Sequence, residues 1–129
     1  MKNKDEMESF LMNLFFSYAW KKKPKVCECG CGTLLPKQFT ITVLDHLLEK
    51  SIYPECKYAI NGIMFVNPDC HASRHNGNLT KNQIMRIKQA KENYENLVKE
   101  STLFVDRVLK NYKIKFYLVN CQKICILFI

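Results

Sequence analysis

Two stretches of the chain decide the expected fold: LDHLLEKS at residues 44–51 and NPDCHASRHNG at residues 67–77. The first stretch continues an alternation of apolar and β-branched polar residues that starts at Gln38 and ends at Asp45, which is typical of a half-buried strand. Just before the second stretch, the residues IMFV at 63–66 predict another short strand that can pair with the first. We therefore expect a strand, a loop, a second strand and a short helix, in that order.

The second stretch also carries the signals that begin and end a short helix. Asn67 is a good N-cap, Pro68 suits the first helical position, and Gly77 can adopt the left-handed conformation that ends a helix. A longer helix is expected to begin at Thr80, because Gln83 lies three residues on as its capping-box partner. The apolar face of this longer helix is expected in the core and consists of Ile84, Ile87, Tyr94, Leu97 and Val98.

The flanking segments give weaker signals. Residues 6–20 are apolar almost all round and contain no Gly or Pro, so we expect a helix buried against the rest of the fold or against a second chain. The basic run at 21–25 ends that helix. Towards the C-terminus we expect an interruption at residues 101–102 and strand-like structure over residues 113–119, which are rich in Ile, Phe, Tyr and Val. The expected divisions are an N-terminal helix and basic linker (1–25), a core (26–79), a C-terminal helical segment (80–112) and an apolar tail (113–129).

The composition predicts one globular domain. A chain of 129 residues with 47% hydrophobic and 25% charged residues can build a single core and is neither a disordered tail nor a coiled-coil rod. The formal charge of +8 favours polyanionic partners such as nucleic acid or an anionic membrane face. No stretch reaches the roughly 18 consecutive apolar residues of a membrane span, so we expect no part of the chain to cross a membrane. Acidic residues precede the apolar segment at 10–20 and a basic run follows it in place of a cleavage site, so it does not resemble a secretory signal and we expect a cytoplasmic protein.

The seven cysteines suggest metal ligation more than disulfides. Because the number is odd, complete pairing within the chain would leave one thiol over, and metal binding or free thiols fit better. Three of them lie in the run CECGCG at residues 27–32, whose glycines permit the tight turns that let sulfurs converge on one point. This run predicts a metal-binding knuckle.

All three histidines of the chain lie within the expected strand–loop–strand–helix unit. His71 and His75 are four residues apart on the short helix, so their imidazoles lie on one face and can share a metal ion. Asp45, at the end of the first strand, can supply an oxygen ligand. His46 follows it, and a free imidazole beside a metal ion is a candidate general base.

Taken together these residues resemble the HNH endonucleases, also called ββα-metal nucleases. The resemblance covers about residues 27–78, and the phrase DHLLEKSIYP at 45–54 is similar to the small phage-encoded HNH proteins. It implies an α+β fold with a ββα-metal core and flanking helices, DNA as the substrate, and a host-cell cytoplasmic location if a phage encodes the protein. The motif residues in this sequence are Asp45, His46, Asn61, His71 and His75.

The resemblance also implies a role for each motif residue. Asp45, His71 and His75 would hold one divalent ion, with positions left open for substrate and water. His46 would activate water, and Asn61 would orient the His46 loop by hydrogen bonding. We expect Mg²⁺ as the ion, although a histidine-rich site also accepts Mn²⁺, Ni²⁺ or Zn²⁺.

A structural zinc ion is a further implication, since many HNH domains hold one with two Cys-x-x-Cys pairs. Cys70 directly precedes the metal-binding histidine, as the later pair requires, but the position of its partner is occupied by Asn67. The earlier cysteines are spaced one residue apart instead of two. Without a metal, such cysteines are buried small apolar groups. The zinc ligands that we expect are Cys27, Cys29, Cys31 and Cys70.

The sequence leaves three functions open. The first is a metal-dependent DNA endonuclease, and the second is a non-catalytic, zinc-stabilised DNA-binding module on the same scaffold, which would not depend on His46. In both we expect Lys50, Arg74 and Lys81 to contact the nucleic acid, although exposed basic side chains are often only solvated. The third is an interaction protein that forms a homodimer or docks on a partner through its apolar N-terminal helix or its C-terminal tail.

Overall fold

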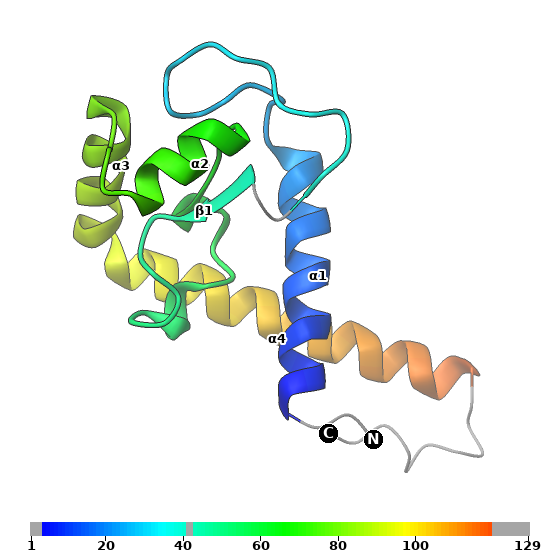
Figure 1. Cartoon of the computed structure of the whole chain (residues 1–129). Coiled ribbons are helices and arrows are strands. Elements are labelled where there is room, and N and C mark those ends of the chain that lie inside the picture. The colour runs from blue at the N-terminus through cyan, green and yellow to red at the C-terminus, as the bar shows by residue number, and fades with distance from the viewer. Residues whose placement is uncertain (1–3, 41–42, 120–129) are drawn as a thin grey trace.

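The chain folds into helices around one small sheet, in a computed structural model that describes residues 4–40 and 43–119 (Figure 1). Figure 1 shows α1 crossing α4, with β1, α2 and α3 to one side of α1. The expected mixture of helix and strand is confirmed. None of the described helices is long and apolar enough to cross a membrane. In chain order the elements are α1 (Lys4–Lys22), β1 (Leu44–His46), the 3₁₀ helices η2 (Pro54–Cys56) and η3 (Ile60–Gly62), β2 (Ile63–Phe65), α2 (Pro68–His75), α3 (Lys81–Glu92) and α4 (Tyr94–Val119).

The sheet consists of β1 and β2, which pair as expected and run antiparallel, with Asp45 opposite Met64. The first strand is shorter than predicted, because residues 38–40 are not in a strand; residues 41–42 lie outside the described residues. A strand extends only as far as its partner, and β2 offers three residues between η3 and the start of α2. Phe39 packs instead against α1, with its ring centroid 5.5 Å from that of Phe16.

The predicted beginnings of α2 and α3 are confirmed. The side chain of Asn67 accepts a hydrogen bond from the Cys70 amide, and Pro68 occupies the first turn of α2. Thr80 and Gln83 bond reciprocally in a capping box at the start of α3. After α2 ends, Gly77 takes a φ of 84°, a conformation that a side chain would strain.

The C-terminal region differs from the sequence-based expectation. The helix α4 continues through residues 101–102 and through 113–119, where an interruption and a strand were expected; residues 120–129 of the expected tail lie outside the described residues. Ser101 is tolerated in mid-helix because its hydroxyl accepts a hydrogen bond from the Tyr58 amide. The break lies instead at Asn93, between α3 and α4. Local strand propensity is a weak signal where a helix already packs on the core.

The face of α3 that turns inward also differs. Ile84 was expected in the core but is 54% exposed, whereas Gln83, which forms the capping box, is buried. Leu97 of α4 is buried as expected, and Ile87, Tyr94 and Val98 are partly buried against the core.

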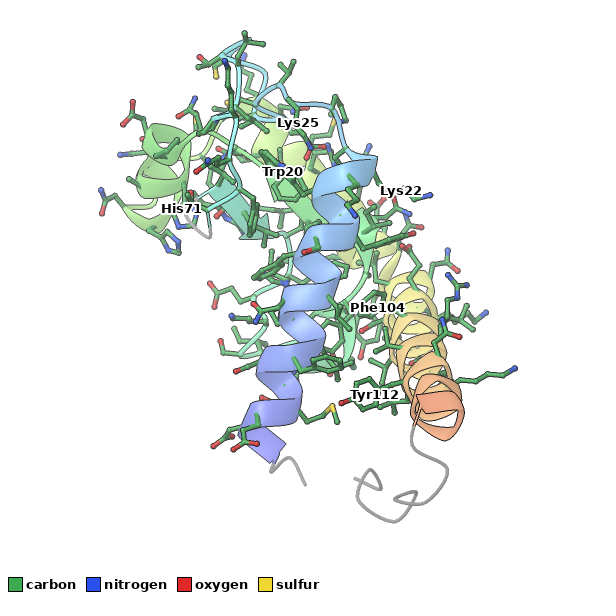
Figure 2. The ribbon with its side chains drawn as sticks, turned by 90° about the vertical axis from the view of Figure 1, so that its right-hand side faces the viewer. Trp20, Lys22, Lys25, His71, Phe104 and Tyr112 are labelled. Carbon is green, nitrogen blue, oxygen red and sulfur yellow. The ribbon has the colours of Figure 1, made fainter. Side chains whose placement is uncertain are left out.

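An aromatic cluster packs α1 against α4, far from each other in sequence. The ring of Phe15 meets those of Tyr58 and Phe104 edge-on, at centroid distances of 5.9 and 5.4 Å. Phe10 and Tyr112 form a similar contact at 5.1 Å. Figure 2 shows Phe104 and Tyr112 on the side of α4 that faces α1. The apolar N-terminal helix is therefore buried, on one side, within its own chain.

The knuckle segment is tied to the sheet through Glu28. Its amide donates to the Phe65 carbonyl at 2.8 Å, and its carboxylate accepts from the Phe65 amide at 2.6 Å. The ammonium group of Lys23 bonds to the same carboxylate at 3.2 Å and to the Ile63 carbonyl at 2.8 Å. These contacts hold the knuckle along the free edge of β2.

The aromatic cluster gives a first prediction. Phe15→Ala should lower the free energy of unfolding by about 3–5 kcal/mol, because it removes a fully buried ring and leaves a cavity. Leu14→Ala on the same helix is the matched control, since Leu14 is 39% exposed, and it should cost about 0.5 kcal/mol. Urea denaturation followed by circular dichroism measures both values. Equal losses in the two variants would contradict the burial of α1 against α4.

Candidate metal centres

The structure brings together the three residues that were predicted to hold a divalent ion. Asp45 comes from the middle of β1, and His71 and His75 come from successive turns of α2. One ligand atom from each residue can be chosen so that all three lie within 4.8 Å of one another. Figure 2 shows His71 on α2, on the other side of α1 from α4 in that view.

The distances within this group fit a shared ion. The Nε2 atoms of His71 and His75 are 3.0 Å apart. Two nitrogens bound to one ion at about 2.1 Å and about 90° apart are separated by about 3.0 Å. On its other side, His71 Nδ1 lies 2.7 Å from Asp45 Oδ1. His71 Nδ1 has no hydrogen-bond partner among the described residues, so His71 can bind one ion through either ring nitrogen: Nε2, shared with His75, or Nδ1, shared with Asp45.

Asp45 is the most buried member of the group, since its side chain is only 4% exposed. Burial raises its pKa above the ordinary value, and the nearby Arg74, His71 and His75 oppose that increase. Arg74 Nη1 lies 3.8 Å from Asp45 Oδ2, which accepts no hydrogen bond from the described residues. A buried oxygen without a donor is costly unless a cation binds there. The residues present therefore fit a divalent ion.

His46 ends β1 and is largely removed from solvent. Its Nε2 lies 3.0 Å from the Lys57 carbonyl oxygen. Because a carbonyl oxygen only accepts, Nε2 carries the proton and Nδ1 is left with its lone pair. Burial lowers the pKa of His46 to about 4, so the ring is neutral at neutral pH. Sequence reasoning missed the contact of His46 with the Lys57 carbonyl, since a backbone group has no sequence signal.

A cleft of about 520 Å³ contains both the metal-ligand group and His46. Lys50 lies in its wall and is exposed, which suits a contact with phosphate. Arg74 also lines it, but its guanidinium is engaged with Asp45 and donates to the Leu47 carbonyl at 3.3 Å. Lys81 is not among the described residues that line this cleft.

Asn61 does not occupy the position that the resemblance implies. Its side chain donates to the Glu100 carboxylate at 3.1 Å and is directed to α4, not to the His46 loop. The loop that follows His46 is held instead by Gly62, the residue after Asn61. The carbonyl oxygen of Gly62 accepts a hydrogen bond from the Leu47 amide at 2.9 Å. A backbone hydrogen bond therefore takes the place of the hydrogen bond that was expected from the Asn61 side chain. Because almost any residue can form a backbone hydrogen bond, the sequence gives no signal for it.

The second group consists of the four cysteines expected to bind zinc, with all sulfurs within 4.8 Å of one another; its members are Cys27, Cys29, Cys31 and Cys70. Cys29 Sγ lies 3.2 Å from the sulfurs of both Cys27 and Cys70, and Cys31 Sγ lies 4.0 Å from that of Cys70. A tetrahedral zinc ion with bonds of about 2.3 Å separates its sulfur ligands by about 3.8 Å. The cluster can thus bind a metal with one cysteine from α2 and three from the knuckle.

The thiols of this cluster differ in their environments. Burial raises the pKa values of Cys27 and Cys29 to about 11. Hydrogen bonds from Thr33 lower the pKa of the exposed Cys31 to about 6. Because a metal binds thiolates, loading the cluster releases protons from the buried thiols.

Comparison with known proteins finds no matching family model, no matching curated protein and no matching solved structure. The assignment of these two centres therefore depends on the residues and their geometry.

The environment of His46 predicts its titration. Between pH about 6.5 and about 4 the unfolded chain takes up a proton on this imidazole that the folded chain does not. The contribution of His46 to stability is thus fully present above pH 6.5 and is lost as the pH falls through this window. We expect an NMR titration of the metal-free protein, assigned with His46→Gln, to give a midpoint of about 4. A midpoint of 6.5 would show that the ring is solvated.

The cysteine cluster predicts a stoichiometry and a pH dependence. One equivalent of Co²⁺ should produce the thiolate-to-cobalt charge-transfer absorption of a tetrahedral site, and Cys29→Ser should weaken it strongly. The affinity should fall as the pH is lowered from about 8 to about 6, since the buried thiols must lose protons. Cys56→Ser is the matched control, because Cys56 is buried in η2 outside the cluster. An unchanged spectrum in Cys29→Ser would contradict the assignment.

Proposed function

We propose that the protein is a metal-dependent DNA endonuclease with a ββα-metal core of the HNH type. The observation that carries the proposal is that one cleft contains a neutral imidazole, His46, beside a group of two histidines and one carboxylate that fits a divalent ion. The order β1, β2, α2 agrees with the core that the sequence resemblance implies.

In this proposal the ion is held by His71, His75 and Asp45, with Mg²⁺ as the expected metal and Mn²⁺, Ni²⁺ or Zn²⁺ as alternatives. A divalent ion there would stabilise negative charge on the phosphoryl oxygens and on the departing 3′ oxygen. The guanidinium of Arg74, 3.8 Å from Asp45 Oδ2, opposes the rise in the pKa of Asp45 that burial causes and so favours the charged carboxylate that an ion would bind. Arg74 is thus assigned to positioning, and its expected contact with phosphate is left to Lys50.

His46 is the proposed general base. With Nε2–H held by the Lys57 carbonyl, the ring presents Nδ1 as the atom that takes a proton from water. Because the pKa of His46 is lowered, this lone pair is unprotonated at neutral pH. The same lowered pKa makes the imidazole a weaker base. The ring cannot turn over without breaking the bond to Lys57, so the geometry is fixed before the substrate arrives.

DNA is the proposed substrate for two reasons. The chain carries a formal charge of +8, and the exposed Lys50 lines the cleft. Contacts with the backbone supply affinity without sequence preference. The cysteine cluster, when loaded with zinc, would hold the first turn of α2 against the knuckle. The same cluster favours the second candidate function, a non-catalytic DNA-binding module.

The test is conversion of supercoiled plasmid at low, stated salt with Mg²⁺ or Mn²⁺, and with EDTA. Metal-dependent nicking is expected for the unmodified protein, and His46→Ala should lower the rate by about 10²–10⁴-fold, the usual contribution of a general base. Asn61→Ala is the matched control and should keep most of the activity, because its side chain bonds to Glu100. If the protein and His46→Ala bind DNA equally and neither cuts with any metal, the zinc-stabilised binding module is the better assignment.

A further inference from the structure

Asn67 lies between the two metal centres and uses every polar group that it has. Its backbone N–H donates to Cys27 Sγ at 3.3 Å, and its side-chain Nδ2 donates to Cys31 Sγ at 3.4 Å. Its side-chain Oδ1 accepts the Cys70 amide at 2.9 Å, and its backbone oxygen accepts the His71 amide at 3.0 Å. Two groups thus face the cysteine cluster and two face the first turn of α2.

The two donors of Asn67 act on the charge of the sulfurs. A hydrogen bond to sulfur stabilises the thiolate relative to the thiol and reduces the negative charge that four thiolates place around one metal ion. Asn67 thus contributes to the cysteine centre although it provides no ligand. It also stands where the resemblance implies a cysteine, and Cys31 of the knuckle supplies the fourth sulfur instead.

The two acceptors of Asn67 fix the start of α2. That helix begins one residue later, and its third and fourth residues, Cys70 and His71, belong to different centres. A shift of the cysteine sulfurs would move Asn67, and with it the amide of His71. His71 is itself held within 3.0 Å of both Asp45 and His75. The two centres therefore share a short, rigid connection.

We propose that Asn67 is a positioning residue that couples the two centres, so that metal in the cysteine cluster raises the affinity of the Asp45–His71–His75 group for its divalent ion. The inference rests on the proposed function for the two metal sites, but it does not require that DNA is cleaved. Coupling of this kind is reciprocal, so an ion held by the histidines also strengthens binding at the cysteines.

The test compares Mn²⁺ binding by calorimetry in the full chain loaded with one equivalent of zinc. Asn67→Asp and Asn67→Ser both keep an oxygen that can cap α2 but lose the Nδ2 donor to Cys31. Outer contacts of this kind usually change metal affinity by about 10–100-fold, so we expect Mn²⁺ to bind about 10-fold more weakly to both variants. Asp69→Asn is the matched control, because Asp69 lies in the same turn of α2 and belongs to neither cluster, and it should bind Mn²⁺ as the unmodified protein does.

A second readout is independent of how well a zinc-free chain folds. With Co²⁺ in the cysteine cluster, addition of Mn²⁺ should shift the thiolate-to-cobalt absorption in the unmodified protein and in Asp69→Asn, but not in Asn67→Ser. Equal Mn²⁺ affinity in zinc-loaded Asn67→Ser and the unmodified protein would overturn the proposal. So would the absence of Mn²⁺ binding to the unmodified protein.

The two proposals fail separately. Mn²⁺ binding that depends on Asn67, in a protein that cuts no DNA, would support the coupling and reject the nuclease. Nicking of plasmid by Asn67→Ser, with unchanged Mn²⁺ affinity, would support the nuclease and reject the coupling.

Discussion

The buried carboxylate of Asp45 is the constraint on which the rest of the candidate site depends. A charge in the middle of a strand must be paired where it is buried, and both partners, His71 and Arg74, come from one face of α2. None of the eight residues of α2, all of which the structure describes, is fully buried. The helix is therefore held over the sheet by polar contacts and sulfur atoms more than by apolar packing, so its position is sensitive to what binds those groups.

This arrangement links stability to metal chemistry. Apolar packing gathers elsewhere, where the sheet and α1 bury large side chains such as Phe15, Ile63 and Phe65. An ion bound only by the folded chain stabilises it in proportion to the logarithm of its concentration over its dissociation constant. In this protein that stabilisation would act on α2, a helix in which no residue is fully buried. The aromatic core and the region of the candidate metal centres would thus be stabilised by different physical terms.

Sequence reasoning succeeded where the signal is local. The helix starts at Asn67 and Thr80 were predictable because a cap and its partner lie within three residues of each other. The ligand groups were predictable because side-chain chemistry and helical spacing restrict which residues can share an ion. The length of β1, the direction of Asn61 and the bond from His46 to Lys57 were not, since each depends on a partner distant in sequence.

The contact between α1 and α4 also orders events in folding. The rings of Phe15 and Phe104 belong to helices near opposite ends of the described chain, so their contact closes a loop that includes both metal centres. Closing so long a loop is entropically costly, and it can proceed only after much of α4 has been synthesised. Until then the part of α1 that packs on α4, which includes Phe10, is exposed to other chains emerging nearby. The side of α1 that meets α4 is therefore covered later than the side that meets Phe39 and Phe65.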